Sequence, residues 1–94
     1  MELRVLRYFL TVVREEKLSR AADIPHITQP TLSRQLAQLE EELGVRLFTR
    51  GRGVALTENG MLLRRRAEEL VELADKTQRG FANQNHALAG RFTK

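Results

Sequence analysis

Leucines at helical spacing mark the centre of the chain. The pattern consists of Leu32, Leu36, Leu39 and Leu43, at steps of four, three and four residues. Such steps place all four side chains on one stripe of an α-helix. Thr28, before the stripe, is a good N-cap, and Gly44, after it, is a good left-handed stop. The pattern therefore predicts a helix over residues 28–44 that is buried along one side.

Polar side chains occupy the first turns of this predicted helix. Gln29, Ser33 and Arg34 lie off the leucine stripe, and their side chains can hydrogen-bond a large partner. Pro30 costs little there, because the first amides of a helix have no internal acceptor. Two interpretations stay open: an ordinary amphipathic surface helix, or a helix that reads DNA with its N-terminal end.

Two more helices are predicted upstream. Apolar residues recur at three-and-four spacing from Leu3 to Val13, and nothing in residues 2–16 breaks a helix. Ser19 is predicted to cap a second, short helix through Asp23. Pro25 ends that helix early or distorts its last turn, because proline lacks an amide donor and crowds the preceding turn. Residues 26 and 27 then form a tight turn, with the isoleucine at 27 facing inward.

Downstream of the central helix the period of the pattern changes. Residues 47–49 and 54–56 are two short runs of strand-forming or apolar residues, separated by Arg50-Gly51-Arg52-Gly53. Glycines supply the positive φ angles of a hairpin tip. The pattern predicts a small two-stranded wing with two arginines at its tip, and a plain glycine-rich loop is the alternative.

The last predicted helix is long, with Thr57 as its cap and Glu58 in its first turn. Its apolar and small residues alternate steps of four and three, which is the spacing of a coiled-coil seam. The seam consists of Leu63, Ala67, Leu70, Ala74, Thr77, Phe81, Gln84 and Leu88. We expect dimerisation through its five apolar members up to position 81. Gly80 weakens the helix by around 1 kcal/mol.

The predicted organisation is mainly α-helical: a DNA-binding unit over residues 1–57, a dimerisation helix over 58–89 and a frayed tail over 90–94. A chain of 94 residues makes one domain with an appended helix. The sequence contains no cysteine, which excludes disulfides and thiolate metal sites and fits a reducing compartment. No apolar run approaches the roughly 20 residues of a membrane span, so we expect a cytoplasmic protein.

The charge of the chain permits an anionic partner without demanding one, and its residues offer little support for catalysis. The net charge is +4 and the pI is about 10.3, and the segment from Leu43 to Thr57 holds three arginines and no acid. His26 and His86 are the only histidines, and they fall on different predicted elements. We therefore expect no enzyme, no metal and no cofactor. No phosphate-binding glycine loop is present either.

Three helices, a tight turn and a basic hairpin together make a winged helix-turn-helix, in which the start of the third helix reaches base edges in the major groove. Gln29 can pair with adenine and Arg34 with guanine or phosphate. The remaining candidates contact base or backbone: Ser33 in the same helix, Arg50 and Arg52 in the wing, Thr28 at the cap, and Ser19 and Arg20 at the start of the second helix.

The specific motifs of the chain are LRYFLTVV, SRAA, ITQPTLSRQLAQLEEELGVRLFTR and LTENG. In this order and spacing they resemble the N-terminal DNA-binding domain of LysR-type transcriptional regulators, from Leu3 to about Leu88. The resemblance implies that Gln29, Pro30, Ser33 and Arg34 face the major groove, with Thr31 between them.

The resemblance further implies that the helix from Glu58 is a linker helix. It would pair antiparallel with that of a second subunit, so that a homodimer holds two reading heads on one dyad-related promoter site. A tetramer is implied for a full-length protein, as are autoregulation and control of a neighbouring operon.

Three departures from the family pattern stand out. Pro25 replaces the usual leucine before the turn, the wing is one residue shorter than usual, and no effector-binding domain follows Gly90. The chain is then either an excised domain or a truncated product. The alternatives are a dimerising fragment that silences full-length regulators, and a winged-helix regulator of another family, such as a MarR-like one.

Overall fold

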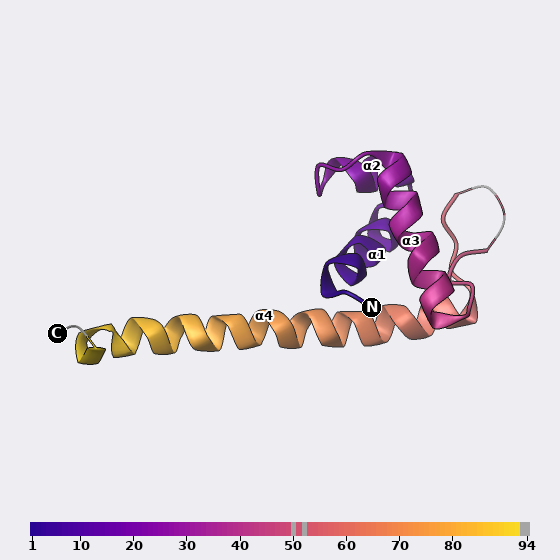
Figure 1. The fold of residues 1–94 in the computed structure, drawn as a ribbon. Helices are drawn as coiled ribbons and strands as arrows, with labels where there is room; N and C mark the ends of the chain where they lie inside the picture. The colour runs from indigo at the N-terminus through magenta and orange to yellow at the C-terminus, as the bar shows by residue number, and fades with distance from the viewer. Residues whose placement is uncertain (50, 52, 93–94) are drawn as a thin grey trace.

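The computed structural model describes residues 1–49, 51 and 53–92, with side chains as far as residue 84. The described part contains four helices in the order α1 (Leu3–Glu15), α2 (Leu18–Asp23), α3 (Gln29–Leu43) and α4 (Glu58–Phe92). Helices α1 to α3 form a small bundle, and α4 is a long rod that passes beneath it in Figure 1. The molecule is elongated, with extents of 60 × 25 × 20 Å.

The core lies where the apolar sides of all four helices meet. Phe9 of α1 is completely buried, and its ring lies 5.6 Å from the ring of Phe48, tilted by 50°. Aromatic pairs at such separations stabilise beyond the area they bury. The core consists of Val5, Leu6, Phe9, Val12, Ala21, Ala22, Leu32, Leu36, Leu39, Leu47, Leu63 and Ala67. Three of the four leucines of the predicted stripe are thus buried, and the fourth, Leu43, is exposed.

Helix α2 begins earlier than the sequence indicates. Its N-cap is Lys17, which makes no side-chain cap hydrogen bond, and Ser19 is the second residue of the helix rather than its cap. The helix ends at Asp23, as Pro25 predicts, and a turn follows in which the Ile27 N–H donates to the Ala22 carbonyl over 3.0 Å.

Both predicted ends of α3 are confirmed. The Thr28 hydroxyl accepts a hydrogen bond from the Thr31 N–H at 3.2 Å. Gly44 has φ +69°, and its N–H donates to the carbonyls of Glu40 and Glu41. These caps satisfy backbone groups that a helix end leaves without partners.

The wing is antiparallel at its base. Phe48 and Leu56 form an antiparallel bridge, and the Thr49 N–H donates to the Ala55 carbonyl over 2.8 Å. These are the two runs predicted to pair, although the pairing in the described residues is a bridge rather than two longer strands. Arg50 and Arg52 at the predicted tip lie outside the described residues.

Helix α4 is anchored at its N-terminal end. Thr57 caps it: its N–H donates to the Leu47 carbonyl at 3.0 Å, and its hydroxyl accepts from the Gly60 N–H at 3.0 Å. The helix runs through Phe92, past the end predicted at residue 89. Among the described residues, no helix is both long enough and apolar enough to cross a membrane.

Two residues predicted for dimerisation have a different role. Leu63 and Ala67 are 8% and 0% exposed and belong to the chain's own core, because α1 packs against this part of α4. The spacing of the seam is helical as predicted, but its first two positions are occupied within the monomer. The exposed apolar members of the seam, Leu70 and Phe81, lie further along α4.

Candidate nucleic-acid interface

The outer face of α3 is open to solvent at its N-terminal end. The leucines at 32, 36 and 39 bury the opposite side, so the residues between them point outward. Gln29, Pro30 and Arg34 are exposed, while Thr31 and Ser33 are half-buried. The structure therefore brings all five residues predicted to read bases onto the first turns of one helix.

A short chain of hydrogen bonds organises this end of α3. The Thr28 hydroxyl donates to the Thr31 hydroxyl at 2.7 Å, and an Arg34 Nη donates to the same Thr31 oxygen at 3.4 Å. Within the described residues Arg34 has no ion pair. Its guanidinium therefore makes one long hydrogen bond and keeps its other N–H donors available for a partner.

Ser33 lies where α3 faces the wing. A cavity of about 240 Å³ lies between the two elements and has a mainly apolar lining that includes Leu36, Phe48 and Val54. Its polar members are Ser33, Glu40 and Thr49. The wing thus stands beside the same helix whose tip carries Gln29 and Arg34 (Figure 1). One elongated ligand along this side of the molecule can contact both.

Glu40 has a role that the sequence interpretation missed. Its Oε2 accepts hydrogen bonds from the backbone N–H of Leu47 at 2.7 Å and of Phe48 at 3.4 Å. Glu40 is half-buried, whereas its neighbours Glu41 and Glu42 are exposed. The carboxylate instead fixes the base of the wing to α3.

Two more residues share the exposed face of α3. Ala37 and Gln38 are exposed, one turn beyond Ser33 and Arg34, which places them next to these residues on the helix surface. The spacing of the leucines could have identified them, because both fall off the buried stripe. Ala37 leaves room for close approach, and Gln38 adds a donor and an acceptor.

At the start of α2, Ser19 and Arg20 are exposed. The amides of the first turn of a helix have no acceptor within it. Among the described residues neither side chain takes part in an ion pair or a hydrogen bond, so both remain available to a partner. Helix α2 packs beside the N-terminal end of α3 (Figure 1).

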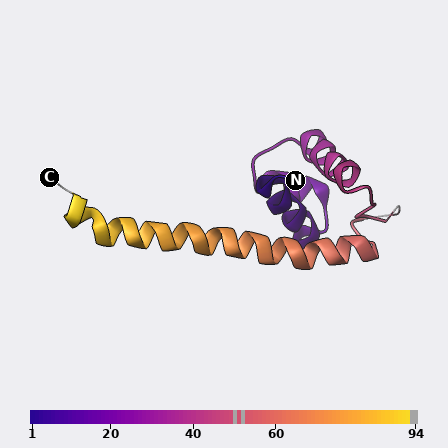
Figure 2. The ribbon, with the colours of Figure 1, turned by 60° about the horizontal axis from the view of Figure 1, so that its bottom comes forward.

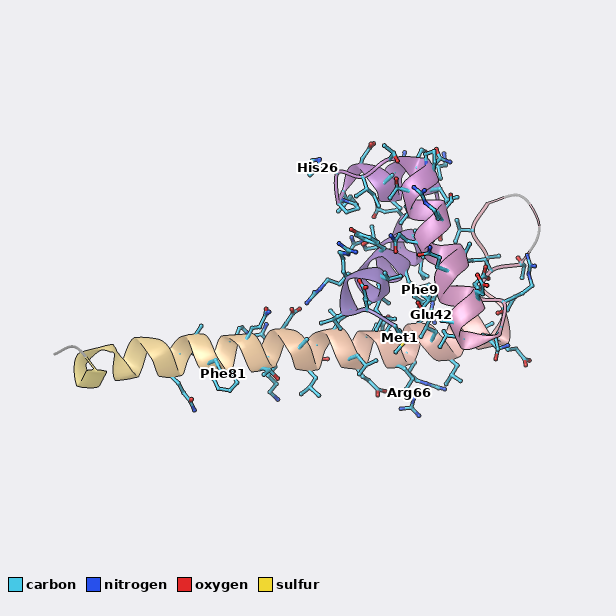
Figure 3. All side chains as sticks on the ribbon, in the orientation of Figure 1. Met1, Phe9, His26, Glu42, Arg66 and Phe81 are labelled. Atoms are coloured by element: carbon cyan, nitrogen blue, oxygen red, sulfur yellow. The ribbon has the colours of Figure 1, made fainter. Side chains whose placement is uncertain are left out.

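The turn between α2 and α3 is strained at one residue. His26 has φ +57°, a left-handed conformation that costs most residues other than glycine free energy. Figure 3 shows its ring at the end of the bundle, directed away from the core. Its position fits a turn residue, as the sequence indicates.

A separate apolar surface lies along α4. Four of its exposed apolar side chains are Leu62, Leu70, Leu73 and Phe81, with exposed fractions of 46%, 41%, 61% and 61%. Leu70 and Phe81 belong to the predicted dimerisation set, and Ala74 from that set is half-buried. Leu62 and Leu73 were missed, because they fall outside the four-three seam. We call these four side chains the α4 apolar surface.

Comparison with known proteins places the chain among bacterial regulators. Residues 3–61 match the family model described as bacterial regulatory helix-turn-helix protein, lysR family. The HTH-type transcriptional regulator BsdA of Bacillus subtilis is 48% identical over 73 residues, which cover 76% of this chain and 25% of BsdA. BenM of Acinetobacter baylyi is 48% identical over 77 residues, which cover 81% of this chain and 25% of BenM.

Solved structures agree with this match. The DNA-binding domain of BenM in a complex with catB site 1 DNA superposes with a TM-score of 0.85 at 44% identity, covering 88% of this chain and 94% of that one. A CbnR DNA-binding domain bound to DNA gives 0.81 at 36% identity, covering 95% and 99%. The chain therefore spans a quarter of the length of BsdA and BenM, but almost all of these two excised domains.

Proposed function

Since the chain belongs to the LysR family of bacterial regulatory helix-turn-helix proteins, we propose that it is a sequence-specific module for double-stranded DNA. It would act in transcription regulation, in the bacterial cytoplasm and without catalysis. Membership in this family removes the MarR-like alternative.

One observation carries the proposal: a solvent-exposed polar helix tip stands beside a wing, in a fold whose solved relatives include DNA complexes. The buried leucines hold α3 in place, so its outer face can enter the major groove without disturbing the core. Helix tip and wing together then span one duplex.

The proposed roles follow from side-chain chemistry. Gln29 and Arg34 would read base edges, since an amide matches adenine and a guanidinium matches guanine. Pro30, Thr31 and Ser33 would shape the contact surface around them. Contacts to the sugar-phosphate backbone would come from the remaining predicted residues: Ser19, Arg20, Thr28, Arg50 and Arg52.

We further propose that the protein works as a homodimer through α4, as a dyad-related operator requires. The support is the α4 apolar surface, because large apolar side chains exposed together on a helix mark sites of association. Leu70, Ala74 and Phe81 keep the role expected from the sequence. We add Leu62 and Leu73 to the residues proposed for dimerisation, and we remove Leu63 and Ala67 because they are buried.

Replacing Arg34 tests the proposed reading head. Arg34→Ala is expected to lose about 1–3 kcal/mol at the preferred site, because a bidentate base contact disappears. The measurement is a fluorescence anisotropy titration of a duplex selected from a random pool, set against an unrelated duplex. The loss should be larger for the selected duplex.

Arg14→Ala is the matched control. It removes the same charge from the exposed end of α1, where Arg14 pairs, among the described residues, only with its neighbour Glu15. If both variants weakened both duplexes equally, the effect would be one of net charge, and the assignment of α3 as the reading helix would be wrong.

A further inference from the structure

A two-pronged ion pair fastens α1 to α4. One Nη of Arg7 lies 2.7 Å from Oδ1 of Asp75, and the other lies 3.5 Å from Oδ2. Arg7 and Asp75 are 41% and 39% exposed. The hydrogen bond from Arg7 lowers the pKa of Asp75 from its ordinary value of 3.8. The two groups therefore interact directly, across 68 positions of sequence.

The position of this pair along α4 is the important point. Side chains of α4 at 71, 74 and 75 are half-buried, whereas every described side chain from 76 to 84 is exposed. Asp75 is thus the last position among the described side chains of α4 that is partly covered. Figure 2 shows the bundle along the N-terminal half of α4 and the rest of the rod extending past it.

The other fastenings of α4 are at its opposite end. Thr57 and Gly60 join it to the base of the wing by backbone contacts. Between the two ends the contacts are apolar, through Leu63, Ala67 and Val71, and apolar contacts are non-directional. Among the described residues, the Arg7–Asp75 pair is the only side-chain hydrogen bond or ion pair between α1 and α4.

Geometry makes this far contact decisive for the direction of the rod. From Gly60 to Asp75 the helix rises about 22 Å, and from Gly60 to Phe81 about 32 Å. Pivoting α4 by about 10° at its anchored end therefore moves the neighbourhood of Phe81 by about 5–6 Å. This exceeds the rise of one base pair, about 3.4 Å.

From this placement we propose that the Arg7–Asp75 pair sets the spacing of half-sites that the dimer reads. The inference rests on the proposed function, since it requires two chains joined through α4. Arg7 and Asp75 are positioning residues here: they touch no DNA, and they fix the angle between each reading head and the rod that joins it to the other.

The first test measures spacing preference directly. Duplexes carrying two copies of the selected half-site are varied in separation by single base pairs and titrated in anisotropy. The wild type is expected to favour one separation, and Arg7→Ala and Asp75→Ala are expected to lose at least about fivefold of that discrimination. Affinity for an isolated half-site should stay within about twofold.

Two further variants separate positioning from general structure. The exchanged pair Arg7→Asp with Asp75→Arg should restore the preference to within about twofold of the wild type. Arg4→Ala removes an α1 arginine whose one ion pair with a described residue is to Glu2, and this variant should leave the spacing preference intact. An unchanged spacing profile in Arg7→Ala, with unchanged half-site affinity, would overturn the proposal.

A second test needs no DNA. The chain has no cysteine, so spin labels can be placed at Glu41→Cys on α3 and Gln78→Cys on α4, both exposed. Labelled chains are diluted with unlabelled ones and measured by double electron–electron resonance. Arg7→Ala should at least double the width of the distance distribution, and Arg4→Ala should not.

The two tests fail in different ways. An equally narrow distribution in Arg7→Ala and wild type would overturn the positioning role, whatever the DNA results. A wild type that binds no selected duplex would overturn the proposed function, and the label distances would still decide whether the pair fixes the rod.

Discussion

At the scale of single residues, the backbone conformation identifies a position at which another amino acid would make the fold more stable. Glu16 caps α1 in the left-handed conformation, with φ +61°, and it is exposed. A side chain in this conformation costs roughly 1–2 kcal/mol that glycine avoids. The left-handed cap is required by the sharp exit from α1, so the strain is local and removable.

Replacing Glu16 with glycine is expected to raise the free energy of unfolding by about 1 kcal/mol, since the cap geometry remains and the strain disappears. The measurement is urea denaturation followed by circular dichroism. Glu15→Gly is the control: it removes the same charge one position earlier, inside the helix, and should lower stability by about 0.5–1 kcal/mol. A loss of stability in Glu16→Gly would contradict the argument.

Replacing each of two glycines of α4 with alanine is expected to change the free energy of unfolding in opposite directions. A Cβ at Gly60 would lie 2.1 Å from the Leu47 carbonyl oxygen and 2.8 Å from a Leu56 methyl carbon, whereas a Cβ at Gly80 would meet nothing within 4 Å. Gly60→Ala should destabilise by about 1–3 kcal/mol through overpacking. Gly80→Ala should stabilise by up to about 1 kcal/mol.

Urea denaturation followed by circular dichroism measures the stability of both variants. The backbone carbonyl at Leu47 also accepts the Thr57 N–H, so it cannot move aside without breaking that bond. Stabilisation by Gly60→Ala would show that α4 and the wing base separate more easily than the contacts indicate.

At the scale of elements, the wing depends on one carboxylate of α3. Removing Glu40 leaves the N–H groups of Leu47 and Phe48 without their acceptor. Glu40→Ala is expected to cost about 1–3 kcal/mol, because a partly buried donor loses its partner. Amide exchange at the base of the wing should accelerate in the same variant.

Glu41→Ala is the matched control for this carboxylate. The neighbouring side chain is exposed, and its removal should change stability by no more than about 0.5 kcal/mol. Equal effects at both positions would mean that the charge of the acidic run, rather than the contact of Glu40, matters.

Features that depend on contacts between near neighbours in sequence could be predicted, and features that depend on contacts between distant segments could not. The ends of α3 at Thr28 and Gly44, and the end of α2 before Pro25, follow from contacts between near neighbours, so the pattern suffices. The role of Glu40 could not be predicted, because its partners, Leu47 and Phe48, belong to the wing, and the charge pattern along one helix does not reveal them. Arg34 and Gln29 were identifiable because they lie off a leucine stripe.

Helix α4 shows the limit most clearly. The four-three spacing correctly predicts a helix, but it does not reveal whether the apolar side chains pack against a second chain or against the chain's own bundle. Leu63 and Ala67 are covered by the chain's own bundle, and only the three-dimensional placement of α1 decides this. The same holds for Arg7 and Asp75, which are too far apart in sequence for any local pattern to pair them.

At the scale of the whole molecule, the α4 apolar surface predicts the state of assembly. Leu73 is 61% exposed, so Leu73→Asp should fold normally and weaken dimerisation at least about tenfold, since a charge would have to be buried in the interface. Sedimentation velocity over a range of chain concentrations measures this. Gln78→Asp, exposed on another side of α4, should dimerise like the wild type.

A dimer of unchanged strength in Leu73→Asp would show that the chains associate elsewhere. DNA titration of the same variant adds a consequence: a single half-site should be bound as before, while a duplex with two half-sites should lose the gain that comes from linkage.

Beyond Asp75, α4 leaves the bundle and continues through Phe92. Seventeen residues of helix, with Gly80 among them, are close to the length at which an isolated helix is marginal in water. In the dimer that we propose, contact with a second chain would stabilise residues 76–92 as a helix, so their helix content is expected to rise with the concentration of the protein. Diluting the protein should lower its helix content while the bundle stays folded. The helix content of residues 76–92 would then report the concentration of the chain.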